Sequence, residues 1–546
     1  MFFCGNAVTP AVADEPVVAT ALQSSQVNGN LYDFGKDGFG WLELKDVPAG
    51  EYELVLGELT NTAGHVVNAY AGSCIRCQTV KGTADGSATF RVPMPADGQN
   101  TGGNAIRLPA KFGVVFPFRY VEVVKCPGAP TAASFVRQTL HAPIDMTKSS
   151  FASDNAVLND VYELCKYSIW ATSFAGTYVD GDRERIPYEA DAYINQLGHY
   201  AVDNDYRMAQ RTAEWLMDHP TWPTEWLQHE VMIAWADWMW SGSTAFPRWY
   251  WQRLVDEKSL ISCERASDGL VVSTGSGPRG SVIPGIGDII DWPAGERDGY
   301  DMRPVCGVIN AFHYRNLREL ADMATALGKT DAAADFAARA TRVRASFRAA
   351  FLDPSTGLFV DGEGSTHSSL HVNAAALAFG LAEPSEYAAL VSFLDGKGMV
   401  CSVYFAQYLL DAFCAAGRAD LAVKYMAASG DRSWKGMMDF GSTITMEAWN
   451  VKAKPNLDLN HAWGAAPINV ISRHILGVTP FTPGFGKISI RPQLGGLGFI
   501  RGKVPTAKGV VEVEAGGGSL TVRTPAPARI EWKGEVHEVS AGRHTF

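Results

Sequence analysis

The spacing of apolar residues changes twice along this chain of 546 residues, and that change limits the folds open to it. Between about Asn28 and Pro127, short alternating runs are separated by Gly, Pro, Asp and Asn, which is typical of a β-sandwich. From Ser153 to Leu476 the apolar residues recur at helical spacing instead. After Pro480 the strand-like alternation returns, so the sequence predicts a helical domain between two β-domains.

The helical region contains roughly ten to twelve apolar-striped segments, joined by loops long enough to carry functional groups. We predict that these segments form a ring of helical hairpins, an (α/α)6 toroid. A solenoid is the alternative, but the sequence shows no repeat of fixed period. The predicted multidomain organisation is a tail at 1–27, a jelly-roll-like β-sandwich at 28–145, the all-α toroid at 146–478 and a small C-terminal β-sandwich at 479–546.

Composition bears on the class of partner. The formal net charge is −11, and no long Lys/Arg stripe is present to release counterions, which argues against nucleic acid and anionic membrane surfaces. No apolar run reaches the roughly 18 residues that cross a bilayer. Carbohydrate is compatible with this charge, and the 15 Trp residues include rings suited to stacking on sugar C–H faces.

Metal and cofactor motifs are weak. Among nine cysteines only Cys74 and Cys77 form a close pair, which leaves open a disulfide between them but does not complete a zinc site. His367 and His371 are four residues apart without an evident third ligand, so hydrogen-bonding roles are favoured. Because phosphate-loop, dinucleotide and serine-nucleophile signatures are also missing, we predict no metal and no cofactor.

The first residues carry a partial export signal. Ala11-Val-Ala13 resembles a signal-peptidase site, although a basic segment and a full apolar segment are not present before it. We predict a truncated signal peptide and a periplasmic or secreted protein, with a cytoplasmic location as the alternative.

The segment from Asp180 to Asp191 is unusually rich in ionisable residues: five carboxylates surround two arginines and a tyrosine. Such a cluster requires a guanidinium, a proton or a polyhydroxylated ligand to offset the repulsion between acids. A second acidic focus surrounds Glu447, far along the chain. Glycosidic hydrolysis needs two carboxyl groups, one to protonate the leaving oxygen and one to act on water or the sugar, and the two foci supply candidates for both.

At these positions the chain resembles the α-L-rhamnosidases of glycoside hydrolase family 78, within the six-hairpin glycosidases. That family carries a pattern close to D-C-P-x-R-D-E-R-L-G-W-T-G-D, and this chain matches it from the Glu184-Arg pair to Asp191. The resemblance implies that Glu184 is the general acid and that Asp180 and Asp191 hold sugar hydroxyls or tune its proton. The segment before Glu184 is shorter than in the family, so Asp182 could take the role of Asp180, and Tyr188 replaces the usual Trp.

Two later motifs extend the resemblance. Gly441 to Trp449 resembles the family's G-A-T-T-[IL]-W-E-x-W, and Asn460-His461 resembles its N-H-x-x-x-G-A. They imply that Glu447 is the general base, that His461 contacts the substrate and that hydrolysis inverts the anomeric configuration. Asp291-Trp292 is similar to the family's G-D-W, which implies that Trp292 is a wall of the sugar site.

Other candidates come from the residue patterns. The Trp-rich segment near 224–240 mixes rings and acids, so Glu225 and Asp237 are plausible hydroxyl-binding groups, as is Glu296 in a Gly/Pro-rich loop. The predicted substrate-binding residues are Asp180, Asp182, Arg183, Tyr188, Asp191, Asp237, Asp291, Trp292, Glu296, Trp449, His461 and Trp463.

Together with the paired carboxylates, the resemblance to glycoside hydrolase family 78 implies an inverting glycosidase that removes terminal α-L-rhamnose from glycans. The alternatives are a hydrolase of another neutral or deoxy sugar, a polysaccharide lyase on a similar toroid, and a glycan-binding protein that has lost catalysis. Linkage, aglycone, oligomeric state and calcium dependence stay open, as does glycan binding by the first β-domain.

Overall fold

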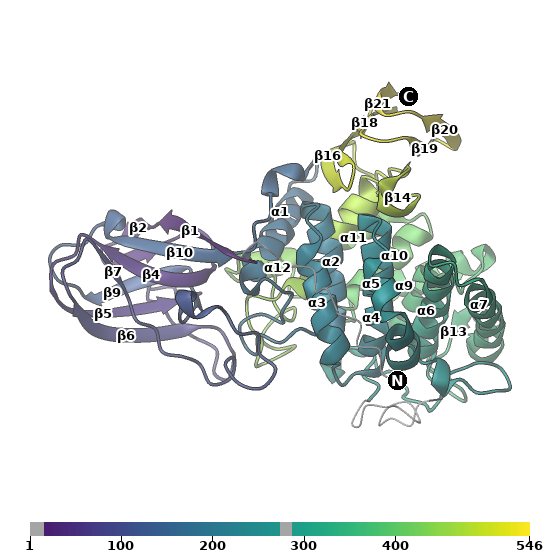
Figure 1. Cartoon of the computed structure of the whole chain (residues 1–546), viewed down its shortest axis with the longest axis horizontal. Coiled ribbons are helices and arrows are strands. Elements are labelled where there is room, and N and C mark those ends of the chain that lie inside the picture. Colours follow the sequence, from purple (N-terminus) through teal and green to yellow (C-terminus); the bar gives the residue numbers. More distant parts are fainter. Residues whose placement is uncertain (1–15, 273–286) are drawn as a thin grey trace, which may run out of the picture.

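The computed structural model describes residues 16–272 and 287–546. The predicted processing site at Ala11–Ala13 lies outside the described residues. Figure 1 shows a β-domain on one side of a helical domain, and a smaller β-domain packed against another part of the helices. This confirms the predicted multidomain arrangement of two β-domains around an all-α centre.

The N-terminal β-domain is a sandwich of two five-stranded sheets. Strand β4 shows why they pack, because its side chains alternate between buried and half-buried positions. Leu42, Leu54 and Phe118 lie in the core between the sheets. One sheet has the order β1 (Val18–Gln23), β10 (Phe135–His141), β4 (Phe39–Lys45), β7 (Thr89–Arg91), with β8 (Phe116–Pro117) also paired to β4. The other has the order β2 (Ser25–Asn28), β3 (Leu31–Asp33), β9 (Tyr120–Lys125), β5 (Gly50–Gly57), β6 (Cys77–Ala84).

The helical domain is built on a closed ring of six inner helices. Each packs against the next, and the last returns to contact the first, which confirms the (α/α)6 toroid. In ring order they are α2 (Glu189–Val202), α4 (Thr224–Ser241), α6 (Gly307–Ala326), α8 (Leu370–Ala378), α10 (Ala406–Ala415) and α13 (Ala466–Val470). Outside this ring or between its members lie α1 (Ala156–Ala171), α3 (Arg207–Asp218), α5 (Ala245–Arg253), α7 (Thr330–Phe351), α9 (Tyr387–Lys397), α11 (Ala419–Met426) and α12 (Trp434–Asp439).

Inner and outer helices differ in sequence as their positions require. Every residue of α2 is buried, because this helix is covered on all sides. In α7 the buried residues Phe336, Ala340, Val343, Phe347 and Phe351 form one stripe, and the remaining face carries charged residues. The hairpin of β12 (Leu352–Asp353) and β13 (Leu358–Phe359) follows α7 directly.

The C-terminal β-domain shares its core with the helices. Ile500, Val513 and Ile530 belong to the same buried cluster as the inner helices. One sheet has the order β11 (Ser150–Ser153), β16 (Phe499–Thr506), β17 (Gly509–Gly516), β18 (Ser519–Thr524), β21 (Gly542–Thr545). The other has the order β14 (Val478–Pro480), β15 (Ile488–Ile490), β19 (Ala528–Trp532), β20 (Glu535–Val539). Strand β11 precedes α1, so it ties the start of the helical domain to the end of the chain.

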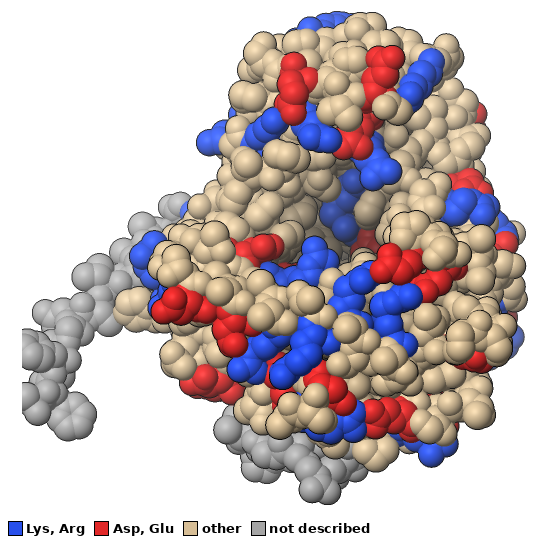
Figure 2. Space-filling model, turned by 90° about the vertical axis from the view of Figure 1, so that its right-hand side faces the viewer, with Lys and Arg blue, Asp and Glu red and all other residues tan. Residues whose placement is uncertain are grey.

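The carboxyl ends of the inner helices surround one opening of the ring. Figure 2 shows the molecule hollowed between its C-terminal β-domain and the helices, with charged side chains inside the hollow. A cavity of about 370 Å³ lies at the carboxyl ends of the inner helices, next to β14. Two of its arginines pair with lining acids: Arg315 Nε donates to Glu319 at 2.8 Å, and Arg473 Nη2 lies 2.6 Å from Asp411. Arginines suit this end, because helix carboxyl ends carry partial negative charge.

Two smaller findings complete the fold. Cys74 and Cys77 are both free thiols, so the disulfide left open by the sequence does not form. In the two described ranges, no helix has the combined length and apolarity that crossing a membrane would require.

Candidate active site

The first acidic segment folds into a closed loop just before α2. Asp180 N donates to Ile186 O at 3.0 Å, and Ile186 N donates to the Asp180 carboxylate at 3.0 Å. Arg185 adopts a positive φ of 56° to complete the turn. Burial raises the pKa of Asp180 well above its usual range; the nearby His461 opposes this shift and Glu184 adds to it. The raised pKa makes protonation of Asp180 easier than that of a free aspartate, and a protonated Asp180 could donate a hydrogen bond.

The Asp182 side chain points away from Asp180, Glu184 and His461 and into the protein. One of its oxygens accepts from Arg76 Nε at 2.5 Å, and the other lies 2.5 Å from Arg185 Nη2. The carboxylate is buried, and both oxygens are engaged by arginines. The structure thus places Asp180, not Asp182, toward the other predicted site residues.

Arg183 brings the two predicted catalytic carboxylates together. Its Nη1 lies 2.8 Å from Glu447 Oε1, and its Nε lies 3.7 Å from Glu184 Oε1. The Glu184 side chain is 36% exposed, whereas that of Glu447 is 2% exposed. Tyr188 donates its hydroxyl hydrogen to Glu184 Oε2 at 2.7 Å. The Arg183 guanidinium therefore lies close to both the accessible carboxyl of Glu184 and the buried carboxyl of Glu447.

Glu447 is surrounded by charged side chains. Lys454 Nζ lies 2.9 Å from Glu447 Oε1, and Asp458 N donates to Glu447 Oε2 at 3.3 Å. Burial raises the pKa of Glu447, the neighbouring Asp458 raises it further, and Arg183 and Lys454 act in the opposite direction. A buried carboxylate with a raised pKa is a suitable proton acceptor.

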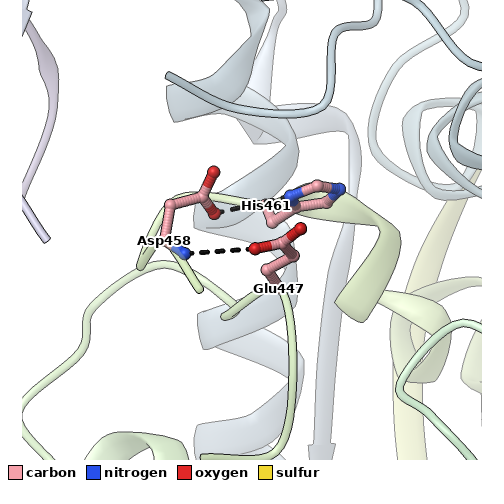
Figure 3. A group of neighbouring side chains, drawn as sticks. All are labelled: Glu447, Asp458 and His461. Atoms are coloured by element: carbon pink, nitrogen blue, oxygen red, sulfur yellow. Dashed lines mark hydrogen bonds and ion pairs between the residues drawn. The ribbon is translucent and has the colours of Figure 1, made fainter. Parts of the chain in front are cut away.

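His461 links the second acidic focus to helix α2. Its Nε2 lies 2.6 Å from Asp191 Oδ1, and its Nδ1 lies 3.4 Å from Asp458 Oδ1. Although burial favours neutral imidazole, the carboxylates of Asp458 and Asp191 raise the pKa of His461 well above its usual value. The imidazolium therefore bridges two acids, and Figure 3 shows it beside Asp458 and Glu447.

Sequence reasoning missed Lys454 and Asp458. Lys454 gives no local signal, because its role depends on a turn that returns it to Glu447. Asp458 precedes His461 by three residues, a spacing that could have drawn attention to it. Both residues set the charge around the predicted base.

The group of Glu447, Asp458 and His461 could in principle hold a metal ion. Their ligand atoms lie within 4.8 Å of one another. The two carboxylates, however, already face Arg183, Lys454 and protonated His461. A bound cation would add positive charge beside these three groups, so the donor set fits an ion-paired acid–base site better than a metal site.

Aromatic rings surround the carboxylates. Trp226, near the start of α4, meets Tyr188 edge-on at 5.6 Å and Trp463 edge-on at 6.2 Å. Trp292 is half-buried and meets Trp222 at 5.8 Å. These rings form an apolar wall near the acids, as sugar sites require.

Glu225 lies next to Trp226 at the same end of α4. It is fully buried, and burial together with Asp288 raises its pKa to about 8. A protonated carboxyl here could donate to a hydroxyl group, and the prediction that Glu225 binds a sugar hydroxyl stays a prediction.

Several predicted binding residues make contacts inside the protein. Asp291 accepts from Ser402 N and lies 2.8 Å from His371 Nε2, whereas Glu296 pairs with Arg432. Asp237 accepts from Tyr200 at 3.2 Å and from Gln210 at 3.1 Å. These three carboxylates are buried and have protein partners. Asp291 and Glu296 support loops, whereas Asp237 lies about three turns along α4 from Glu225, toward the carboxyl end of that helix and away from the acid cluster.

Two predicted tryptophans are also anchored internally. Trp449 donates its ring N–H to Cys401 O at 2.7 Å and packs edge-on against Trp434. Trp463 donates its ring N–H to the backbone carbonyl of Glu447 at 2.9 Å. Trp463 therefore helps to fix the position of the predicted base.

We expect Gly181→Ala to destabilise the protein more than Gly430→Ala does. Both glycines have φ near +100°, at 93° and 101°, so both variants incur backbone strain of about 1–3 kcal/mol. A Cβ at position 181 would also lie 2.7 Å from Asn460 O, whereas nothing lies within 4 Å at position 430. Overpacking should add about 1–3 kcal/mol at position 181 in denaturant unfolding. Equal losses would contradict the close packing of the two loops.

Comparisons with known proteins identify the family of this chain. A profile described as the bacterial alpha-L-rhamnosidase six-hairpin glycosidase domain matches residues 146–475. An alpha-L-rhamnosidase of Alteromonas sp. (strain LOR) is 26% identical over 446 residues, covering 74% of this chain and 47% of that relative. One from Streptomyces avermitilis is 24% identical over 421 residues, covering 69% of this chain and 37% of the relative. The chain thus spans about half the length of these curated relatives, or less.

Solved structures show the same fold. The Streptomyces avermitilis alpha-L-rhamnosidase complexed with L-rhamnose superposes with a TM-score of 0.77 at 18% identity, covering 97% of this chain and 53% of that one. An alpha-L-rhamnosidase from Dictyoglumus thermophilum gives 0.75 at 17% identity, covering 96% and 63%.

Proposed function

Because this chain belongs to the bacterial α-L-rhamnosidase six-hairpin glycosidase family, we propose that it hydrolyses terminal α-L-rhamnosides with inversion at the anomeric carbon. The observation that carries the proposal is that Glu184 and Glu447 both lie close to the Arg183 guanidinium, 3.7 Å and 2.8 Å away. One carboxyl is open to a ligand and the other is buried among cations. Hydrolysis with inversion needs such a pair of unlike carboxyl groups.

In the proposed reaction Glu184 is the general acid. Its proton passes to the glycosidic oxygen as the bond from the anomeric carbon to that oxygen breaks. The hydroxyl of Tyr188, 2.7 Å from Glu184 Oε2, orients the carboxyl. The partial exposure of Glu184 leaves room for the departing group.

Glu447 is the proposed general base. It takes a proton from a water molecule as the water oxygen bonds to the anomeric carbon from the opposite face. Arg183 and Lys454 oppose the effect of burial on the pKa of Glu447 and so favour its ionised form. Inverting pairs stand about 6.5–9.5 Å apart so that this water fits.

We assign sugar binding to groups near these carboxyls. Burial raises the pKa of Asp180, and in its protonated form this residue would donate to a sugar hydroxyl, whereas Asp191 and His461 form a charged pair beside it. Trp226 and Trp292 offer apolar faces, which suit the methyl group and C–H faces of a deoxy sugar.

A panel of nitrophenyl glycosides tests the assignment. We expect release of nitrophenol from the α-L-rhamnoside at least about 100-fold faster than from the α-L-fucoside, the β-D-glucoside and the β-D-glucuronide. Proton NMR of the reaction should show β-L-rhamnose as the first product. Initial release of the α anomer would make Glu447 a nucleophile, and preference for another sugar would reject rhamnose as the substrate.

Replacing Asp458 by Asn should move the acidic limb of the kcat/KM profile to lower pH. Asp458 raises the pKa of Glu447, so removing its charge lowers that pKa, and the base stays ionised at lower pH. His461 retains Asp191 as a partner and stays charged on this limb. We expect a shift of about one pH unit, while Asp431→Asn, at an exposed ion pair with Lys452, leaves the profile unchanged. An unmoved limb would remove Glu447 from the base role.

We also propose that the protein acts outside the cytoplasm. The support is the signal-peptidase-like Ala11-Val-Ala13. N-terminal sequencing of the protein from its native host checks this, because cleavage after Ala13 is the expected result.

A further inference from the structure

The connector between β5 and β6, residues 58–76, packs into the helical domain. Leu59 and Ile75 are buried in the core of the helices and not in the core of the β-sandwich. Tyr70 packs on Phe440 with ring centres 5.0 Å apart. Cys74 N donates to Leu457 O at 2.9 Å. The connector therefore lies against the segment that carries Asp458 and His461.

Glu58 begins this connector and binds the second catalytic segment. Its Oε1 accepts from Asn460 Nδ2 at 2.7 Å, and its Oε2 accepts from Arg76 N at 2.6 Å. Asn460 in turn accepts, through Oδ1, from Asp182 N at 2.8 Å. Because Glu58 and Asn460 are buried, water does not compete for these hydrogen bonds.

Arg76 ends the connector and binds the first catalytic segment. Its Nε donates to Asp182 Oδ2 at 2.5 Å, and its Nη2 donates to Asp182 O at 3.2 Å. The hydrogen bonds thus form a closed circuit: Glu58 to Asn460, Asn460 to Asp182, Asp182 to Arg76, and Arg76 back to Glu58. We call this circuit the interdomain clamp.

The clamp holds residues directly next to the proposed catalytic groups. Asp182 precedes Arg183 and Glu184, and Asn460 precedes His461. Gly181 packs so closely on Asn460 that a side chain at position 181 would meet its backbone. A change in the spacing of the two segments would therefore move Arg183 relative to Glu447. Misplacement by about 1 Å can lower turnover about 100-fold.

From this geometry we infer that Glu58 and Arg76 of the β-sandwich are positioning residues for the hydrolytic site in the helical domain. This inference rests on the proposed function for its kinetic consequence. The β-sandwich would accordingly be part of the enzyme's active machinery, beyond any role in covering helix ends or binding glycan.

The test compares Glu58→Ala and Arg76→Ala with Glu51→Ala. Glu51 lies on strand β5, which leads directly into the connector, but its side chain is exposed and pairs with Lys125. We expect kcat on the nitrophenyl α-L-rhamnoside to fall about 30- to 100-fold in the two clamp variants, and KM to rise as well, since Asp180 and His461, which are assigned to sugar binding, lie next to the clamped residues. Glu58→Gln should give an intermediate kcat, because one of the two accepting oxygens becomes an NH2 group, which cannot accept a hydrogen bond.

Hydrogen exchange gives a readout that does not depend on the reaction. In both alanine variants, amide exchange in 180–186 and 457–461 should accelerate at least about tenfold, while exchange in α7 should stay unchanged. If the wild-type protein cleaves none of the glycosides, the proposed function fails while exchange still tests the clamp. Wild-type kinetics and exchange in the variants, or equal acceleration throughout the protein, would overturn the inference. If the alanine variants do not fold, Glu58→Gln and Arg76→Lys carry the same comparison.

Discussion

Glu184→Gln is expected to lower kcat on an alkyl α-L-rhamnoside by about 10²- to 10⁴-fold, because the amide cannot give a proton to the departing oxygen. With a 2,4-dinitrophenyl leaving group, which departs without a proton, the loss should be less than about tenfold. Stopped-flow or steady-state assays on both substrates measure the contrast. The side chain is partly exposed, so the fold should be retained.

The matched control for Glu184→Gln is Glu386→Gln. Glu386 also pairs with an arginine, Arg348, at 2.6 Å, but lies far along the chain from the acid cluster. Its variant should keep full activity on both substrates. Equal losses on the two substrates in Glu184→Gln would show that Glu184 acts in binding and not as the acid.

Glu447→Ala should reduce kcat by about 10²- to 10⁴-fold on both substrates alike, since the base acts on water and not on the leaving group. Azide can enter the space left by the side chain and bond to the anomeric carbon without losing a proton. Added azide should therefore restore turnover and give the β-L-rhamnosyl azide, which NMR identifies.

Stability must be measured alongside this second variant. Arg183 and Lys454 would lose their shared buried partner, and an uncompensated buried charge destabilises a protein by about 3–5 kcal/mol. Thermal unfolding separates this effect from lost chemistry. A folded Glu447→Ala protein that forms the α-configured azide would reject inversion, and one with unchanged hydrolysis would reject Glu447 as the base.

The fold could be predicted largely from the period of the apolar residues. Helix α7 can be predicted from its regular stripe of apolar residues, and the strand that contains Leu54 can be predicted from its alternation of apolar and polar residues. Ring closure could not be predicted in this way, because contact between α13 and α2 depends on packing across the whole domain. The pairing of β11 with β16 is equally hidden, since neither strand carries a local sign of its partner.

The candidate site could be predicted where motifs fix a residue's neighbours in sequence. Glu184 and Glu447 were predicted in this way, and the structure brings both to Arg183. Motifs could not show which aspartate of the first cluster turns inward, because Arg76, which engages Asp182, belongs to another domain. The partners of Asp291 and Glu296 are likewise distant in sequence, so a pattern of acids could not separate ligand contacts from structural ion pairs.

The burial of Leu59 and Ile75 among the helices also bears on how such chains can evolve. A recombination breakpoint near residue 146 would follow the edge of the matched profile, yet it would strip two apolar side chains from the helical core and open a gap there. A helical domain joined to a different β-domain by such a breakpoint would need apolar side chains from that domain that fill the same space. The two parts should therefore have descended together rather than being exchanged freely between lineages.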